Sequence, residues 1–223
     1  MSKLVRGALA APIVAATVLG TVVAQADVAA ASTVVALWHM NETSGTTMVD
    51  SSGHHNNGAL HNVTLGGGGF SGKAYSFNGT SSYVSVPSSA SLNPGSANIT
   101  ISFYLSTTSL PKSGDYDLVR KGAYPAQNYK VELLPSGQIM CTFQGSSSRH
   151  NATGGSGLNN GAWHHIQCIK TASQIKTVID GTVRATTNAT VGSISNTSAA
   201  YLGAHPGSDW YKGKLDEVQI TVG

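Results

Sequence analysis

The stretch YKVELLPSGQIMCTF at residues 129–143 indicates the fold class most directly. Apolar residues alternate with polar ones before and after the Pro-Ser-Gly segment at 135–137. Side chains two positions apart share one face of a strand, and Pro, Ser and Gly are typical turn residues. The stretch therefore predicts two antiparallel strands joined by a tight turn.

The same period of two continues outward from this hairpin in both directions. Short-loop hairpins are also predicted around Asn78-Gly79 and around Asp180-Gly181. Further strands are predicted over 75–77, 83–85, 99–105, 163–169, 175–179, 182–185, 201–202 and 215–222. About a dozen short strands joined by Gly-rich turns predict a single all-β domain, a sandwich or a barrel, with no linker and no internal repeat.

The first residues are typical of an export signal. Lys3 and Arg6 precede an apolar run, and Ala-Gln-Ala at 24–26 offers the small-x-small pattern that signal peptidase cuts. We therefore expect residues 1–26 to be a signal peptide and residues 27–223 to be the mature, secreted domain. A cut a few residues later and an uncleaved membrane anchor are the alternatives. No later stretch approaches the ~20 apolar residues of a spanning helix, so we expect no membrane insertion.

Composition limits the partners and the redox compartment. Lys and Arg number 13 against 10 Asp and Glu, and no basic stripe is visible, which argues against a nucleic-acid partner. Cys141 and Cys168 are the two cysteines of the chain. In an exported protein such a pair predicts one disulfide, and two free buried thiols are the alternative.

Short motifs are spread over nearly the whole mature chain. They include LWHMNE at 37–42, GKAYSFNG at 72–79, WHH at 163–165, IDG at 179–181 and GKLDEV at 213–218. In this order and spacing they resemble the laminin-G-like domains of the concanavalin A-like lectin/glucanase superfamily. The resemblance implies a jelly-roll β-sandwich of two antiparallel sheets in which the first and last strands are neighbours. It also implies extracellular binding, often of glycans, and often a structural calcium ion.

The last predicted strand gives an independent reason to expect a cation. If its side chains alternate, Asp216 points into the core with the aliphatic residues that follow it, and a buried carboxylate without a partner is costly. Asp50 lies in a loop rich in Gly, Ser and Asn, with Asn56 close behind it. Calcium prefers such oxygen ligands, so we predict a structural Ca²⁺ at Asp50, Asn56 and Asp216. The alternatives are a turn cap for Asp50 and, for Asp216, pairing with Lys214 or a backbone amide.

Catalytic patterns are weak in this sequence. A glycoside hydrolase needs two carboxyl groups on either side of the scissile bond. Asp115 and Asp117 have alternate spacing, but they lie in a loop-like stretch with no Glu nearby in the sequence. The adjacent His pairs at 54–55 and 164–165 lack the spacing of zinc ligands. We therefore expect no enzyme, and a divergent glycanase or polysaccharide lyase is the less favoured alternative.

A glycan-binding surface needs exposed aromatic rings with polar groups beside them, because sugar C–H groups pack on ring faces. Trp210 and Tyr211 lie in a turn-rich segment with Asp209 beside them, and Tyr124 lies in a Gly-Ala-Tyr-Pro segment. These residues predict a non-catalytic module that binds a carbohydrate, either a polysaccharide or a glycoprotein glycan. The alternatives are an extracellular protein partner or a structural role, and packing of Trp210 or Tyr211 under the sandwich edge.

Overall fold

The computed structural model describes residues 31–223, so the predicted signal peptide lies outside the described residues. Residues 31–223 form one unit with two antiparallel sheets of eight strands each. The predicted all-β sandwich of two antiparallel sheets is therefore confirmed.

Sheet A contains the first and the last strand of the domain. Its order is β14 (Thr182–Asn188), β13 (Gln174–Ile179), β12 (Trp163–Lys170), β7 (Ile99–Ser106), β16 (Lys212–Val222), β5 (Lys73–Asn78) and β4 (Thr64–Gly68), with β1 (Thr33–Trp38) paired to β16. The pairing of β1 with β16 confirms that the first and last strands are neighbours.

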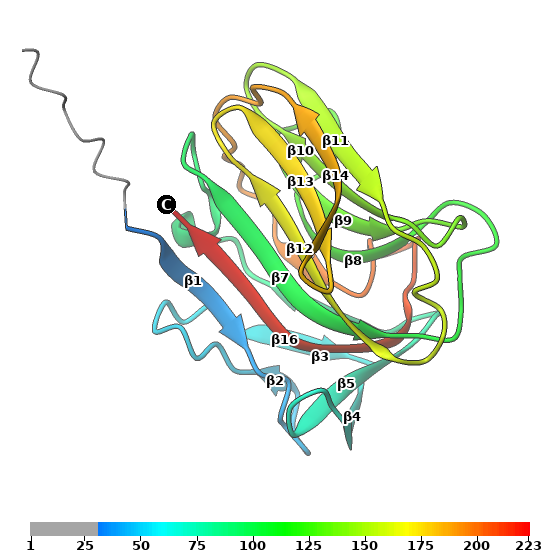
Figure 1. Cartoon of the computed structure of the whole chain (residues 1–223). Helices are drawn as coiled ribbons and strands as arrows, with labels where there is room; N and C mark the ends of the chain where they lie inside the picture. Colours follow the sequence, from blue (N-terminus) through cyan, green and yellow to red (C-terminus); the bar gives the residue numbers. More distant parts are fainter. Residues whose placement is uncertain (1–30) are drawn as a thin grey trace, which may run out of the picture. The chain divides into compact units, whose positions relative to one another are not determined.

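Sheet B contains the predicted central hairpin. Its order is β11 (Arg149–Gly154), β10 (Ile139–Gln144), β9 (Asn128–Leu133), β8 (Tyr116–Lys121), β15 (Ala200–Leu202), β6 (Tyr83–Val86), β3 (Gly58–His61) and β2 (Thr47–Met48). One 3-10 turn, η1 (Ala90–Leu92), follows β6. No helix of the described part is long and apolar enough to span a membrane. Figure 1 shows the two sheets stacked as two layers.

The core lies between the inner faces of the two sheets, and sequence alternation decides which side chains enter it. In β7 the side chains are alternately buried and half-buried along all eight residues. The largest fully buried aromatic side chains come from both sheets and from the loop before β16: Trp38, Tyr75, Phe103, Tyr129, Phe143 and Tyr211.

Two of the three predicted hairpins are confirmed, and the third is wrong. The 129–143 hairpin is β9 and β10, and the turn at 180–181 joins β13 to β14. Around Asn78-Gly79, however, β5 belongs to sheet A and β6 to sheet B. The Asn78 carboxamide oxygen accepts hydrogen bonds from the backbone amides of Thr80 at 2.8 Å and Ser81 at 2.9 Å. The same turn residues therefore carry the chain from one layer to the other.

A bulge in the last strand reverses the predicted direction of Asp216. Leu215 pairs with Leu105, Asp216 pairs with Tyr104, and the register shifts directly after this pair. Glu217 has a φ of 49°, the left-handed conformation that inserts an extra residue into a strand. Leu215 therefore faces the core, and Asp216 shares the outer face of sheet A with Tyr104. The prediction that Asp216 points into the core is wrong.

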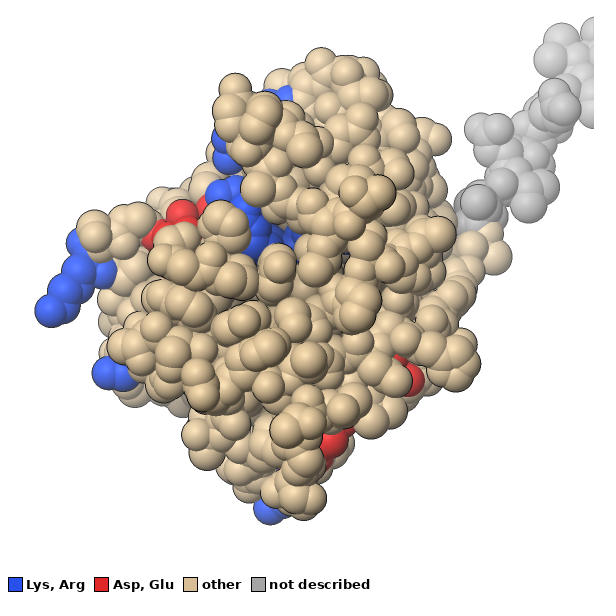
Figure 2. Space-filling model, turned by 180° about the vertical axis from the view of Figure 1, so that it is seen from behind, with Lys and Arg blue, Asp and Glu red and all other residues tan. Residues whose placement is uncertain are grey.

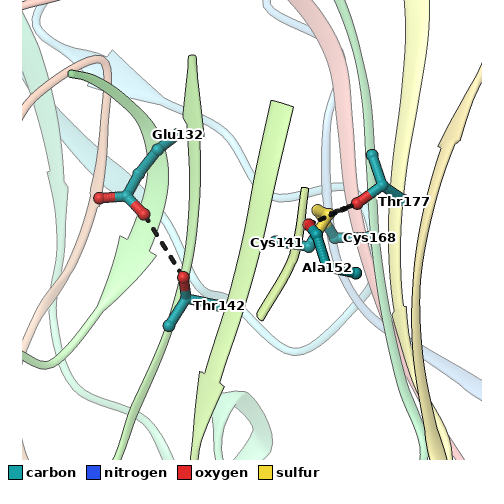
Figure 3. The surroundings of a disulfide bond; sticks show 6 residues. All are labelled: Glu132, Cys141, Thr142, Ala152, Cys168 and Thr177. Carbon is teal, nitrogen blue, oxygen red and sulfur yellow. Dashed lines mark hydrogen bonds between the residues drawn. A yellow bond between two sulfur atoms is a disulfide. The ribbon is translucent and has the colours of Figure 1, made fainter. Parts of the chain in front are cut away.

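A disulfide joins the two sheets through the core, which confirms the predicted pair. Cys141 of β10 and Cys168 of β12 have their Cα atoms 5.5 Å apart. Beside it, the Thr177 hydroxyl of sheet A donates a hydrogen bond of 2.8 Å to the Ala152 carbonyl of sheet B. Figure 3 shows both links on the inner side of sheet B, with Glu132 on its other side.

Candidate functional site

The predicted metal ligand Asp50 is held by hydrogen bonds from its own loop and from β1. Its carboxylate accepts the backbone amides of Leu37, Ser52 and Asn56 and the Ser52 hydroxyl, at 2.8–2.9 Å. Burial raises the pKa of Asp50, but these four bonds outweigh it and leave the pKa below its usual value. The arrangement is the turn cap that the sequence left open as an alternative.

The other two predicted ligands, Asn56 and Asp216, also form hydrogen bonds within the protein already. The Asn56 side-chain amide donates to the Val35 carbonyl at 2.7 Å, and the Asn56 carbonyl accepts from the Trp38 indole at 2.8 Å. Asp216 is fully buried, because the loop before β5 covers the outer face of sheet A at this point. One of its oxygens accepts the Ser71 amide at 2.9 Å.

The donor set predicted for calcium does not fit one shared ion. Asp50 and Asp216 have no hydrogen-bond partner in common among residues 31–223. Neither belongs to a cluster of three or more acidic or histidine side chains in that range. Both carboxylates are instead satisfied by backbone amides.

The predicted ligand-binding residues fall into different environments. Tyr211 is fully buried, and its hydroxyl lies within hydrogen-bonding distance of the backbone carbonyls of Ser106 and Lys214, to either of which it can donate. The prediction that Tyr211 touches a ligand is wrong, because its ring fills the space between the sheets. Trp210 stays half-buried at the surface. Tyr124 is 72% exposed, with the Arg149 guanidinium 5.8 Å from its ring centre.

A groove crosses the outer face of sheet B, and we call it the Tyr201 groove. Two pockets of about 490 Å³ and about 300 Å³ adjoin there and share Ala199 and Tyr201 in their walls. The larger pocket is lined further by Thr47, Asn57, Gly58, Ala59, Ser85 and Pro87. The smaller one is lined further by Arg120, Gly122, Ala123, Ser198 and His205. Most of the lining side chains are small, apolar and polar ones are mixed, and the Tyr201 ring is common to both pockets.

Aromatic rings gather beside this groove. Tyr83 and Tyr201 project from neighbouring strands of sheet B, and their ring centres are 6.2 Å apart. Trp210 lies 5.8 Å from Tyr83, and His61 stacks on Tyr83 at 4.2 Å. All four rings are half-buried. They form a ring cluster on the outer face that offers partly exposed apolar surface next to the groove.

Charged side chains are buried at the Arg120 end of the groove. Asp117 of β8 and Glu132 of β9 are cross-strand partners and at most 1% exposed. Arg120 donates to Asp117, and Lys130 donates to Glu132. Burial raises the pKa of Asp117 to about 6 even though Arg120 lowers it. Burial likewise raises the pKa of Glu132, which Lys130 only partly opposes.

Three further side chains, those of Asp115, His205 and Asp209, lie close to the pair of Asp117 and Glu132. Asp115 lies with Asp117 and Glu132 in one cluster whose ligand atoms are all within 4.8 Å of one another. Asp117 also forms a second such cluster with His205 and Asp209. Burial lowers the pKa of His205, and nearby Arg120 lowers it further. Seen from behind (Figure 2), the molecule shows a mostly uncharged face, with some Lys and Arg atoms in a hollow and others scattered along the edges.

Most residues of this site are not predicted from the sequence. Tyr201, Arg120 and His205 each looked unremarkable in isolation, and Glu132 lies 15 residues beyond Asp117. A signal existed in the 129–143 hairpin, because Glu132 falls on its polar face, which must lie outside the core. Pairing β9 with the strand before it would have placed Glu132 beside Asp117.

Sheet A carries a separate aromatic surface on its outer face. Phe70, which is 51% exposed, stacks on Tyr104 at 3.6 Å, and Tyr104 stacks on His165 at 4.6 Å. These rings border a depression of about 570 Å³ that also contains Glu217. These three stacked rings lie on sheet A, whereas the Tyr201 groove lies on sheet B.

Comparisons with solved structures give the same fold. The binding domain of Paraclostridial Mosquitocidal Protein 1 superimposes with a TM-score of 0.68 at 18% identity, over 84% of this chain and 48% of that chain. Domain 4 of AbnA, a GH43 extracellular arabinanase from Geobacillus stearothermophilus solved with arabinotriose, gives 0.63 at 20% identity, over 86% and 93%. Domains LG4-5 of the mouse laminin alpha1 chain give 0.53 at 16% identity, over 66% and 40%.

These matches are to binding domains and laminin G domains, and the chain spans about half the length of the mosquitocidal binding domain. No curated protein matches the sequence. The family model of the concanavalin A-like lectin/glucanases superfamily matches residues 78–221, which is more than half of the chain. The resemblance stated from the motifs is thus confirmed, and the chain belongs to the concanavalin A-like lectin/glucanases superfamily.

Proposed function

We propose that this protein is a secreted module that binds a carbohydrate chain in the Tyr201 groove without cleaving it. The observation that carries the proposal is the junction of two pockets at Tyr201, with the rings of Tyr83 and Trp210 close by. A linear sugar chain needs an elongated cleft with ring faces and hydroxyl-binding groups, and this groove provides both.

The scarcity of unpaired charged side chains in the lining supports a neutral sugar more than a strongly charged one. The larger pocket contains no charged side chain, and the smaller one adds Arg120, whose guanidinium is already paired with Asp117. Ser85, Ser198 and Asn57 lie in the walls and can exchange hydrogen bonds with hydroxyl groups. The arabinanase domain solved with arabinotriose has the same fold, which is compatible with such a ligand.

Export and a bound calcium ion belong to the same proposal. Export is supported by the N-terminal pattern over 1–26 and by the Cys141–Cys168 disulfide, because such bonds persist in oxidising compartments. Calcium is supported by the acidic clusters of sheet B, not by the Asp50 set, whose oxygens are already in use.

Binding without catalysis follows from where the acids lie. Glu132 is fully buried and Asp117 is 1% exposed, so these carboxyl groups are not placed on either side of a sugar in open solvent. A glycosidase needs its acid and its second carboxylate at about 5–9 Å across an accessible cleft. The nearby acids are closer together and lie beneath the groove.

The test is a polysaccharide and glycan-array screen of the secreted protein and of two variants, Tyr201→Ala and Trp210→Ala. We expect retention on one glycan class and a loss of about fivefold or more in each variant, because a stacked ring contributes about 1 kcal/mol or more. Phe70→Ala on sheet A is the matched control and leaves glycan retention unchanged. Reducing-sugar release in the same wells would contradict a purely binding role.

A protein partner is the second candidate, and one specific feature favours it. Phe70 exposes about half of its surface and continues the stack of Tyr104 and His165. Exposed aromatic clusters are common at protein interfaces. If the array shows no retention and Phe70→Ala abolishes capture of an extracellular protein, the sheet A surface is the functional one.

A further inference from the structure

Two buried carboxylate oxygens at the Arg120 end of the groove have no hydrogen-bond partner. They are Oδ1 of Asp115 and Oδ1 of Asp117, and no other buried side-chain polar atom of residues 31–223 is left unsatisfied. Asp117 is 1% exposed, so water does not solvate this oxygen freely. Leaving a buried charged acceptor unpaired is costly, so a missing partner is expected here.

The neighbouring oxygens point to the nature of that partner. Glu132 contributes a carboxylate to the same cluster, in which the three ligand atoms lie within 4.8 Å of one another. One Glu132 oxygen is paired with Lys130. The other accepts only a long bond of 3.4 Å from the Thr142 hydroxyl. Three carboxylates at this spacing can meet one small cation, because calcium–oxygen distances are about 2.3–2.6 Å.

The local charge has the sign that a cation requires. Asp115, Asp117, Glu132 and Asp209 face one another through the two overlapping clusters. The basic groups paired into them are Arg120 and Lys130. In their ionised forms the four carboxylates exceed these two basic groups by two negative charges, which one divalent ion neutralises.

We propose that Asp115, Asp117 and Glu132 bind one hard divalent cation, with calcium as its main occupant. Each residue supplies a carboxylate oxygen, which is the ligand type that calcium prefers, and the two unsatisfied oxygens are the first to coordinate. Asp209 lies in the overlapping cluster around Asp117 and adds negative charge at its edge. The remaining positions of the ion are filled by backbone carbonyls or water.

This site differs from the one expected from the sequence in both place and ligands. The predicted set combined Asp50 with the last strand of sheet A, whereas this cluster lies on β8 and β9 of sheet B. The carboxylate oxygens of Asp50 accept four hydrogen bonds. The cluster around Asp117, by contrast, keeps two oxygens without a partner. The site gives the calcium ion of the proposed function its ligands and rests on that part of it, but it does not depend on carbohydrate binding.

The experiment is isothermal titration of chelator-treated protein with CaCl₂ alone, followed by melting curves with and without the ion. We expect one site with a dissociation constant on the order of 10⁻⁴ M, typical of extracellular modules. The melting temperature should rise with calcium, because the ion binds the native state alone. No heat of binding and no shift at millimolar calcium would overturn the proposal.

Two variants and a control locate the ion. Asp115→Asn removes one ligand charge from a half-exposed residue, so the fold is retained and calcium affinity falls at least tenfold. Glu132→Gln serves as the second variant, with far-UV circular dichroism as the check on folding. Asp50→Asn is the matched control and keeps the affinity unchanged. Loss of calcium binding in Asp50→Asn but not in Asp115→Asn would assign the ion to the other sheet and overturn the proposal.

Discussion

Cys141 of β10 and Cys168 of β12 form a disulfide that ties sheet B to sheet A through the core. A hydrogen bond beside the disulfide also links the layers, because the Thr177 hydroxyl donates to the Ala152 carbonyl (Figure 3). Near the edge of the sandwich, the Thr187 hydroxyl of sheet A donates to the Asn151 carbonyl of sheet B at 2.8 Å, and most of the remaining contact between the sheets is apolar. The disulfide and the buried hydroxyl together set the alignment of the two layers at this point.

Removing the disulfide is expected to lower the free energy of unfolding by about 3–4 kcal/mol, because it closes a loop of this size in the unfolded chain. The cysteines are 27 residues apart. The double variant Cys141→Ala/Cys168→Ala and the reduced wild-type protein should both show the loss in urea unfolding. Equal midpoints for oxidised and fully reduced protein would rule out this stabilising role.

Asp50 gives a stability change that depends on pH. Its hydrogen bonds hold the folded-state pKa below the usual 3.8, so the native state binds fewer protons than the unfolded state near pH 4. This contribution is complete above the unfolded pKa and is lost as the pH falls through the folded pKa. Asp50→Asn should therefore destabilise the protein by about 1–3 kcal/mol at pH 7.

The difference between wild type and Asp50→Asn should shrink as the pH falls below 3.8, and urea midpoints at several pH values measure it. Asp180→Asn is a useful comparison, because Asp180 also has a lowered pKa but lies at an exposed turn. Its effect should be smaller. If the loss of stability in Asp50→Asn stays the same at every pH down to acid unfolding, the packing of the side chain, not its charge, matters at this position.

The alternation of apolar residues was enough to predict most strands, but not which sheet each one joins. Asn78-Gly79 has the composition of a hairpin turn, yet β5 and β6 lie in different layers. A local turn signal reports only that the chain reverses. The partner of each strand depends on contacts with β16 and β15, which are more than 100 residues away.

The candidate site was harder to predict for two physical reasons. No glycine marks the bulge at Glu217 in the sequence. Strict alternation of side chains along the strand therefore predicted the wrong face for Asp216. The acidic cluster arises from cross-strand pairing of Asp117 with Glu132, which no spacing within one strand reveals. Trp210, chosen because it lies in a turn-rich segment, does lie at the surface next to Tyr83.

Gly203 lies at the start of the segment that carries His205 and Trp210. Its φ is +80°, and a Cβ there would lie 2.2 Å from the Phe77 ring. Gly203→Ala should therefore cost about 2 kcal/mol or more, from backbone strain and from overpacking together. Gly207→Ala is the matched control, since its φ is +101° but no atom lies within 4 Å of the added Cβ. Thermal unfolding should separate the two variants clearly, and equal losses would mean that the Phe77 contact is unimportant.

Lys121 gives a second pH dependence, of the same sign as that of Asp50 but on the alkaline side. Its side chain is fully buried, and its ammonium group donates to the Asn196 backbone and side-chain oxygens at 2.9 Å each. Burial lowers the pKa of Lys121 from 10.5 to about 8. Between these values the unfolded state binds more protons than the native state, so the free energy of unfolding should rise with pH.

The comparison with Lys121→Met isolates this contribution, because the variant keeps the side-chain length and removes the charge. From about pH 7 to about pH 9 the wild-type protein should gain stability relative to the variant. The measurement stops there, because the buried tyrosines, whose pKa values are raised, oppose the trend once they ionise in the unfolded chain. Parallel stability curves for the two proteins would show that Lys121 keeps an ordinary pKa, with its charge fully compensated by Asn196.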